Sequence, residues 1–201
     1  MGKWRMITYL SFPSGCSVND GINASLSSLA YISVDDIATA AARLGPGALL
    51  AKADIESAYR LIPVHPLLAM QWDGKSVVDM MLPFGLRSSA KIFNAVADVL
   101  SWHLQQAGIT LLFHYLDDFV IVGAPQSTQC ADSPEILDKE CSWLLVPMAA
   151  HKHEDPTTCL PVLGIVIDTI AGSCAYQTTS WSDCDHCCSS GATEQLVHAK
   201  S

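Results

Sequence analysis

The sequence has few basic residues. Only 11 of its 201 residues are Lys or Arg, against 20 Asp or Glu, so the net charge is −9. This deficit disfavours a protein that grips nucleic acid through its phosphates alone. The deficit is uneven, because residues 1–125 hold eight basic and ten acidic residues while residues 126–201 hold three and ten. The first part is therefore nearly neutral, and the acidity belongs mainly to the second.

Long apolar runs are also missing. No run reaches the roughly 20 residues that span a bilayer, and the start "MGKWRMITYLSFPSG" lacks an apolar segment followed by a small-residue cleavage site. We therefore expect an intracellular protein, cytoplasmic or nuclear, with no membrane partner. Without a secretory signal the eight cysteines should be reduced thiols. Four of them crowd into the last 28 residues: Cys174, Cys184, Cys187 and Cys188.

Half of the residues are hydrophobic and 15% are charged, which predicts a packed core. Periodicity and punctuation predict strands over 4–12, 47–55, 76–83, 109–115, 119–123 and 160–168, and helices over 33–47, 88–108 and 133–145. The helix 88–108 has an apolar stripe made of Ile92, Val96, Val99, Leu100, Trp102 and Leu104. Hairpins mixed with helices predict an α+β domain, with one sheet and helices mainly on one of its faces.

Two adjacent acids interrupt the apolar stretch "LLFHYLDDFVIVG". Burying Asp117 and Asp118 together costs several kcal/mol unless something compensates their charge. Asp54 also ends an apolar strand, so neighbouring strands would bring Asp54 and Asp117 to one divalent cation, which prefers carboxylate oxygens. The alternative is that "LDD" is only a polar turn, since Asp is common in turns.

Five motifs in order resemble the reverse transcriptases of retroelements, with the match closest to the DIRS-like group that encodes a tyrosine recombinase. They are "GKWRMI…SVNDGI", "KADIESAYRLIPVHP", "LPFGLRSSAKIFNAVAD", "HYLDDFVIVG" and "AHKHEDPTTCLPVLGIVID". The resemblance covers residues 1–169. It implies a polymerase palm with an antiparallel sheet and packed helices, plus partial fingers. The thumb, RNase H and recombinase parts of such an element are expected to be missing.

The resemblance assigns the chemistry to four side chains. Asp54 and Asp117 would be the main metal ligands together with the backbone carbonyl of Ile55, and Asp118 would support a second metal site. The implied cofactor is two Mg²⁺ ions, with Mn²⁺ as an alternative. Lys152 would protonate or neutralise the leaving pyrophosphate. Without the motif, Lys152 reads equally well as a surface lysine.

The resemblance also assigns a nucleotide site to Lys3, Arg5, Ser57, Ala58, Tyr59, Phe84 and Gly85. Lys3 and Arg5 would reach the triphosphate, and the ring of Tyr59 would exclude a ribose 2′-hydroxyl. Gly85 would allow close backbone approach to template and nucleotide. From the residues alone, Tyr59 is an ordinary half-buried aromatic and the two cations are a solvated face.

Template and primer contacts are implied for Arg87, Lys91, Tyr115, Leu163 and Gly164. Arg87 and Lys91 start the long helix and are suited to phosphates, although a solvated helix face is the alternative. The implied partners are an RNA or DNA template with its primer, and dNTPs.

The chain departs from the family in two places. The connection "IPVHPLLAMQWDG" is a few residues shorter than usual, and residues 170–201 do not continue toward a thumb. The codons that span Asp183–Cys184, His186–Cys187 and Cys187–Cys188 must encode leucine in another frame. We therefore interpret the tail as a frameshifted, disordered segment. A zinc site at Cys184, Cys187 and Cys188 with His186 or His198 is the alternative, although a second cysteine pair is lacking.

The sequence thus predicts an RNA-directed DNA polymerase that transfers dNTPs to a primer by two-metal catalysis. Two alternatives stay open at this point. One is a non-catalytic relic of a transposon, favoured by the short connection and the tail. The other is nucleic-acid binding without catalysis, in which affinity falls steeply with salt but no dNTP is incorporated.

Overall fold

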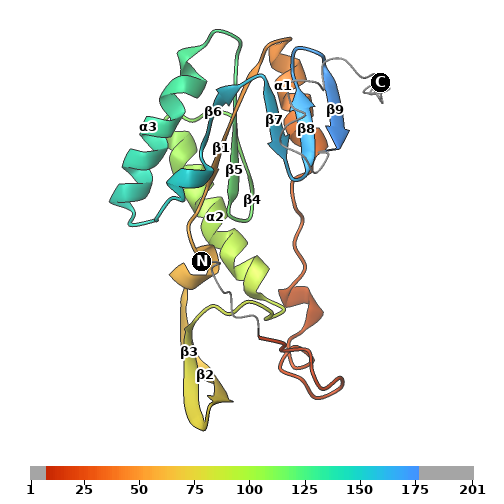
Figure 1. Ribbon diagram of the computed structural model, residues 1–201, viewed down its shortest axis with the longest axis vertical. Helices are drawn as coiled ribbons and strands as arrows, with labels where there is room; N and C mark the ends of the chain where they lie inside the picture. The colour runs from red at the N-terminus through yellow and green to blue at the C-terminus, as the bar shows by residue number, and fades with distance from the viewer. Residues whose placement is uncertain (1–7, 177–201) are drawn as a thin grey trace.

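The computed structural model describes residues 8–176, and a four-stranded antiparallel sheet forms its centre (Figure 1). The strand order is β4–β5–β1–β6. The described elements are the helices α1 (Val34–Leu44), α2 (Ser89–Gln106) and α3 (Thr128–Trp143), the 3₁₀ helices η1 (Ala24–Leu26), η2 (Ala58–Leu61) and η3 (Ala150–Lys152), and the strands β1 (Leu49–Asp54), β2 (Pro63–Trp72), β3 (Lys75–Met81), β4 (Leu112–Tyr115), β5 (Asp118–Gly123), β6 (Glu154–Thr157), β7 (Cys159–Val162), β8 (Ile165–Asp168) and β9 (Ser173–Tyr176).

The central sheet is covered on both faces because its apolar side chains alternate. One face packs against α2 and α3, through Ala51, Ala53, Phe119, Ile121, Phe93, Ala97, Leu100, Leu137 and Cys141. The other packs against α1 and the β7–β8 hairpin, through Leu50, Val120, Val122, Ile37, Ala41, Leu160, Val162 and Ile167. The α+β prediction is confirmed, with two of the three helices on one face. Within the described residues the single predicted sheet is replaced by three, since β2–β3 and β7–β8–β9 are separate.

The first helix begins where the sequence predicts. The Ser33 hydroxyl accepts a hydrogen bond from the Asp36 N–H, and the Asp36 carboxylate accepts one from the Ser33 N–H, which forms a capping box. The helix ends at Gly45, whose φ of 99° suits glycine. Local sequence therefore sets both ends of α1.

The second helix is present, but its predicted apolar stripe is only partly buried. Leu100 and Leu104 lie in the core, whereas Ile92, Val96, Val99 and Trp102 are exposed. The buried face is instead Ser89, Phe93, Ala97, Leu100, Ser101 and Leu104. Both stripes have helical spacing, so periodicity could not choose between them. Packing on the sheet selects the face that carries Phe93.

The third helix begins five residues before the predicted start. Ser127 caps it by accepting from the Gln129 N–H, and Pro134 lies inside it rather than in its first turn. The predicted start took Pro134 as the first helical residue, a position where proline is common. The helix in fact starts earlier, so this prediction was wrong. Here the helix tolerates the missing N–H, and the neighbouring Ser133 hydroxyl donates to the Gln129 carbonyl.

Two hairpins replace elements that the sequence predicted differently. The predicted strand 160–168 is broken by a turn at Leu163 and Gly164, with φ of 50° and 82°, so β7 and β8 pair with each other. The shortened connection "IPVHPLLAMQWDG" forms strand β2. A turn at Asp73 and Gly74 then lets β2 pair with β3. Asp-Gly is the strongest sequence signal for a tight hairpin, and it was overlooked.

The described structure continues past residue 169 into β9. The disordered tail was predicted from residue 170, but residues 170–176 form a turn and strand β9. The rest of that tail, from 177 onward, with its frameshift and zinc interpretations, lies outside the described residues, as does the part of the predicted strand 4–12 before Thr8. Residues 8–12 themselves form no strand. Within residues 8–176 no helix is both long and apolar enough to span a lipid bilayer.

Candidate active site

Three aspartates come together at one end of the central sheet. Asp54 ends β1 and pairs directly with Asp118, the first residue of β5. Asp117 lies in the two-residue loop of the β4–β5 hairpin, where Leu116 adopts a left-handed φ of 53°. Non-glycine residues pay of order 1–3 kcal/mol for such a conformation, which is typical of functional sites. The sequence predicted that Asp54 would lie near Asp117, and the β1–β5 register shows that Asp54 stands directly opposite Asp118.

The carboxylates disturb one another electrostatically. Burial raises the pKa of Asp117, and the negative charges of Asp54 and Asp118 raise it further. Burial also raises the pKa of Asp118, an effect that the ammonium of Lys52 opposes and the neighbouring Asp54 reinforces. Like charges directly across a strand pair are destabilising. The site therefore holds more negative charge than its surroundings favour.

Two lysines balance part of this charge. The Lys152 Nζ lies 2.7 Å from Asp54 Oδ2, although the two residues are 98 positions apart in the chain. The Lys52 Nζ lies 3.4 Å from Asp118 Oδ1. Asp54 itself is almost fully buried, with 4% of its surface exposed. Sequence reasoning identified Lys152 but missed Lys52, whose signal was a lone cation within the apolar strand "LLAKAD".

The donor set fits a divalent cation that also uses substrate oxygens. Within residues 8–176 no group of three or more Asp, Glu, His or Cys side chains is arranged so that it could hold a metal ion by itself. Mg²⁺ does not require one, since one or two carboxylates plus phosphates and water commonly hold it. Asp54, Asp117 and Asp118 supply hard oxygen donors with excess negative charge, which is the chemistry that Mg²⁺ prefers.

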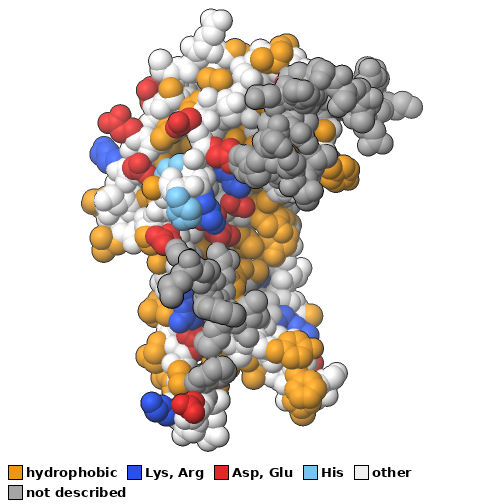
Figure 2. Space-filling view, in the orientation of Figure 1, with side chains coloured by type: hydrophobic (Ala, Val, Ile, Leu, Met, Phe, Trp, Pro, Cys, Tyr) orange, Lys and Arg blue, Asp and Glu red, His pale blue; other side chains and the backbone are white. Residues whose placement is uncertain are grey.

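A cleft of about 820 Å³ opens beside these carboxylates. Its lining brings together residues from β1, η2, the β4–β5 loop and η3: Thr8, Asp54, Ile55, Glu56, Ser57, Ala58, Tyr59, Arg60, Asp79, Phe84, Leu116, Asp117, Ala149, His151 and Lys152. Figure 2 shows acidic, basic and histidine side chains gathered near the middle of the face that it draws. Three of the four predicted catalytic residues, Asp54, Asp117 and Lys152, and most of the predicted nucleotide residues thus share one cavity, and Asp118 lies beside it, paired with Asp54.

Tyr59 stands in this cleft within an aromatic cluster. Its ring centroid lies 5.0 Å from that of Phe84 and 5.5 Å from that of Phe93. Burial raises the pKa of the Tyr59 hydroxyl, and the charges of Tyr31 and Asp117 add to this. Ser57, just before η2, has a left-handed φ of 58°. The chain is therefore held in an uncommon conformation where it passes the carboxylates.

Three of the predicted contact residues instead hold the N-terminal segment. A methyl group at Gly85 would collide with the carbonyl oxygen of Thr8, so glycine is needed there for close backbone packing. Arg87 donates from Nη1 to the Ile22 carbonyl at 3.0 Å. Lys91 donates to the Ser25 carbonyl at 2.8 Å. Their predicted roles toward nucleotide and template stay predictions. To bind nucleotide or template, these residues would have to share or give up their contacts with the N-terminal segment.

The remaining predicted residues lie near the carboxylates or beyond the described chain. Tyr115 pairs with Asp118 across the β4–β5 hairpin, and its ring packs on Tyr31 with centroids 4.7 Å apart. Leu163 lines the same small gap as Tyr115 and Asp118, and Gly164 is the next residue of the β7–β8 turn. Lys3 and Arg5 lie outside the described residues.

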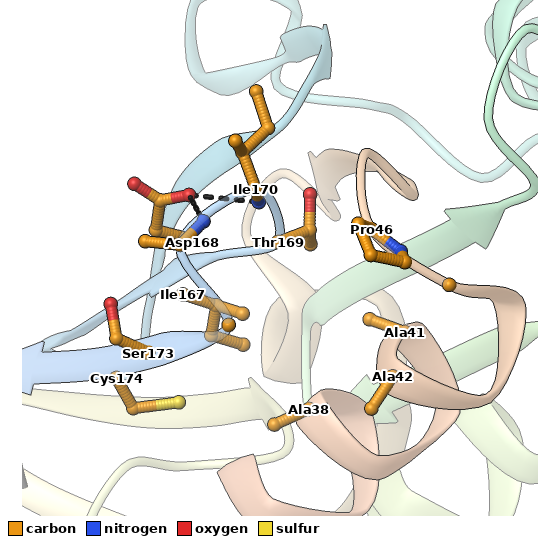
Figure 3. Close-up of a pocket in the computed structure, with 13 residues that line it drawn as sticks. Ala38, Ala41, Ala42, Pro46, Ile167, Asp168, Thr169, Ile170, Ser173 and Cys174 are labelled. Atoms are coloured by element: carbon orange, nitrogen blue, oxygen red, sulfur yellow. Dashed lines mark hydrogen bonds between the residues drawn. The ribbon is translucent and has the colours of Figure 1, made fainter. Parts of the chain in front are cut away.

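A second cavity of about 300 Å³ lies between the end of α1 and the β8–β9 turn (Figure 3). Alanines 38, 41 and 42 line one side of it. On the other side, the Asp168 carboxylate accepts hydrogen bonds from the backbone N–H groups of Ile170 and Ala171, at 2.9 and 2.8 Å. The acid therefore stabilises its own turn, and the cleft beside Asp54 is the better candidate site.

Replacing Asp117 with Asn should stabilise the metal-free protein at alkaline pH. A raised folded-state pKa means that the carboxyl favours folding below the unfolded pKa, near 4, and that this contribution is lost as the pH rises through the folded pKa. At pH 8, in EDTA, we expect a Tm about 2–4 °C above the parent, equivalent to about 1 kcal/mol.

The control is Asp132→Asn on the exposed surface of α3, which should leave the Tm unchanged. The gain for Asp117→Asn should shrink as the pH falls toward 4. A Tm at pH 8 that is equal to or below that of the parent would show that ionised Asp117 does not strain the fold.

The comparisons with known proteins add a fold assignment. No protein-family model matches the chain, and no curated protein matches it either. A foamy viral protease–reverse transcriptase in complex with double-stranded DNA superposes with a TM-score of 0.67 at 18% identity, over 88% of this chain and 29% of that chain. The chain has a reverse-transcriptase fold. The native prototype foamy virus enzyme gives a TM-score of 0.53 at 21% identity, over 81% and 21% of the two chains.

These neighbours confirm the predicted fold class. At such low sequence identity the similarity shows the fold alone. The chain spans less than a third of the length of either viral protein. Three residues in or next to the cleft were not predicted: Arg60 and Asp79 line it, and Lys52 lies beside Asp118. Lys52 was overlooked for the reason given above, and Arg60 directly follows Tyr59 in "SAYR". Asp79 gave no signal beyond being an acid within an apolar strand.

Proposed function

We propose that this chain is the fingers and palm part of an RNA-directed DNA polymerase from a retrotransposon of the DIRS-like group. In the proposed reaction the primer 3′-hydroxyl attacks the α-phosphate of a template-paired dNTP, so that the nucleotide is joined to the primer and pyrophosphate leaves. The observation that carries the proposal is that Asp54 and Asp117 share one cleft with Lys152 and Tyr59, on a reverse-transcriptase fold. Asp118 pairs with Asp54 next to this cleft.

Asp54 and Asp117, with the Ile55 carbonyl, would hold Mg²⁺, and Asp118 would support a second ion. The ions, or Mn²⁺ in their place, would stabilise the attacking and leaving oxygens of the phosphoryl transfer. The residues themselves concentrate negative charge at one end of the sheet. The hydrogen bonds from the Ile55 N–H to the Asp117 carbonyl, and from the Ala149 N–H to the Asp54 carbonyl, fix that end of the sheet.

Lys152 supplies a cation at the mouth of the cleft. It is only half covered, with 43% of its side chain exposed, so it can reach a substrate phosphate while remaining next to Asp54. There it can neutralise or protonate a leaving pyrophosphate, as a positioned general acid does. The cleft therefore has acidic side chains suited to a metal ion directly beside a basic side chain suited to a phosphate.

Tyr59 and Phe84 form the apolar wall of the cleft. Because the Tyr59 ring is packed against both Phe84 and Phe93, it has little freedom to move aside. A rigid ring at this point excludes a ribose 2′-hydroxyl and so selects dNTPs. Phe84 offers a flat apolar surface to a base pair rather than a hydrogen bond.

The proposed partners are a primer, its RNA or DNA template, and dNTPs. Support for the nucleic acid comes from the structural neighbours, which are foamy viral proteins solved with double-stranded DNA and with an RNA/DNA hybrid. With only 11 basic residues, the chain should bind a primer–template weakly, and its affinity should fall further as the salt concentration rises.

The test is extension of a labelled DNA primer on an RNA template, with Mg²⁺ and the four dNTPs at low salt. We expect incorporation that requires the divalent ion and favours dNTPs over rNTPs. Binding without any incorporation, in Mg²⁺ and in Mn²⁺, would contradict catalysis and favour a nucleic-acid-binding role. Neither binding nor incorporation would favour the non-catalytic relic.

A further inference from the structure

An ion pair between a nearly buried carboxylate and a partly exposed arginine lines one wall of the cleft. Asp79, in β3, exposes only 5% of its side chain. Both of its carboxylate oxygens accept from Arg60 Nη1, at 2.7 and 2.8 Å, and Oδ1 also accepts from the Met81 N–H at 3.1 Å. A buried carboxylate this well paired depends strongly on its cation, because removing one partner leaves an uncompensated buried charge.

The pair links η2 to the far strand of the β2–β3 hairpin, whose first strand follows η2 directly in the chain. The β2–β3 hairpin pairs with no other strand among the described residues, and it projects away from the central sheet at the bottom of Figure 1. An isolated two-stranded hairpin is marginally stable in water. At its base, the Leu82 N–H donates to the Ile62 carbonyl at 2.8 Å, next to the Arg60–Asp79 pair. These contacts attach the hairpin to η2.

The same short helix carries Tyr59, directly before Arg60. η2 has only one turn, in which the Arg60 N–H donates to the Ser57 carbonyl at 2.7 Å. The Tyr59 ring is fixed from one side by Phe84 and Phe93. Its backbone is fixed from the other side through Arg60. A shift of η2 would therefore move the Tyr59 ring relative to Asp117, which lines the same cleft.

We propose that Arg60 is a positioning residue for sugar selection. Through Asp79 it holds η2 and the base of the β2–β3 hairpin together. The Tyr59 ring then keeps the position in the cleft from which it excludes a ribose 2′-hydroxyl. The inference rests on the proposed polymerase function. It assigns Arg60 a role through Asp79 rather than through a substrate phosphate, although Arg60 lines the cleft and 41% of its side chain is exposed.

The experiment measures kcat/KM for a dNTP and for the matching rNTP in primer extension. Arg60→Met removes the cation but keeps the apolar stem. We expect the dNTP-to-rNTP ratio to fall about tenfold, below the roughly 100-fold effect of a 1 Å misplacement. Arg60→Lys should restore most of the ratio. Lys75→Met, at the exposed tip of the same hairpin, is the matched control and should keep the parental ratio.

Two other outcomes would overturn the proposal. A direct phosphate contact predicts that Arg60→Met lowers kcat/KM equally for both nucleotides and leaves their ratio unchanged. A purely structural pair predicts a lower Tm with an unchanged ratio. In the double variant Arg60→Met/Asp79→Asn the buried carboxylate that would lose its cation is also removed. If the single variant does not fold, the dNTP-to-rNTP ratio of kcat/KM is measured on this double variant.

A second measurement does not depend on activity. Backbone amide exchange at residues 79–82 should become faster in Arg60→Met and in the double variant, while exchange in α1 stays as in the parent. Unchanged exchange at 79–82 would overturn the anchoring role. A parent chain that fails to extend any primer would overturn the proposed function and the sugar-selection role together, whereas a retained ratio in an active Arg60→Met variant would overturn this inference alone.

Discussion

Replacing Asp117 with Asn should reduce primer extension by about 10³-fold or more. The substitution keeps the size of the side chain but removes one of the carboxylates assigned to the metal. If metal assistance contributes about 4 kcal/mol to lowering the barrier, its loss corresponds to about 10³-fold in rate. The measurement is single-turnover incorporation of one dNTP at saturating Mg²⁺, on an RNA template.

The fold should tolerate this substitution, because ionised Asp117 is disfavoured by burial and by Asp54 and Asp118. A loss of activity in a protein that melts at the same or a higher temperature therefore reports chemistry and not unfolding. Asp132→Asn, an equal change on the exposed side of α3, should extend primers at the parental rate. Extension that is indifferent to Asp117→Asn would remove the catalytic assignment of this hairpin.

Replacing Phe93 with Ala should cost about 3–5 kcal/mol of unfolding free energy and lower the Tm by about 10 °C. Phe93 exposes 1% of its surface and lies where α2 meets the central sheet. Its loss opens a cavity that the surrounding side chains cannot fill. Its ring also supports Tyr59, so the variant tests the link between the core and the cleft.

The matched control is Ile92→Ala, one residue earlier in the same helix. Ile92 is 40% exposed, so the substitution should change the unfolding free energy by less than about 1 kcal/mol. Phe93→Leu should fall between the two, because it leaves a smaller cavity. Equal losses for Ile92→Ala and Phe93→Ala would mean that α2 packs on the sheet by the other stripe.

Local sequence predicted the elements that carry their own signals. Ser33 and Asp36 start α1, and Gly45 ends it, by contacts within a few residues. The acidic pair in the β4–β5 hairpin and Asp54 at the end of β1 were predicted from apolar strands that end in acids. These features are local, so neighbouring residues are enough to identify them.

Other features depend on which faces meet. The stripe containing Ile92 and the stripe containing Phe93 are both helical, and only contact with β1 and β5 decides between them. The Leu163–Gly164 turn was hidden because Leu163 is an unusual residue for a left-handed φ. The apolar run around it reads as one strand until the hairpin forms.

By itself, the sequence determined the ends of α1, the presence of the long helix and the hairpin that presents Asp117 and Asp118. The tertiary structure decided that Asp54 faces Asp118, that Lys52 and Lys152 balance them, and that Arg60 and Asp79 close the cleft beside Tyr59. The reason is physical. Strand register and ion pairs between residues as far apart as Asp54 and Lys152 depend on the packing of the whole sheet, whereas caps and turns depend on their immediate neighbours.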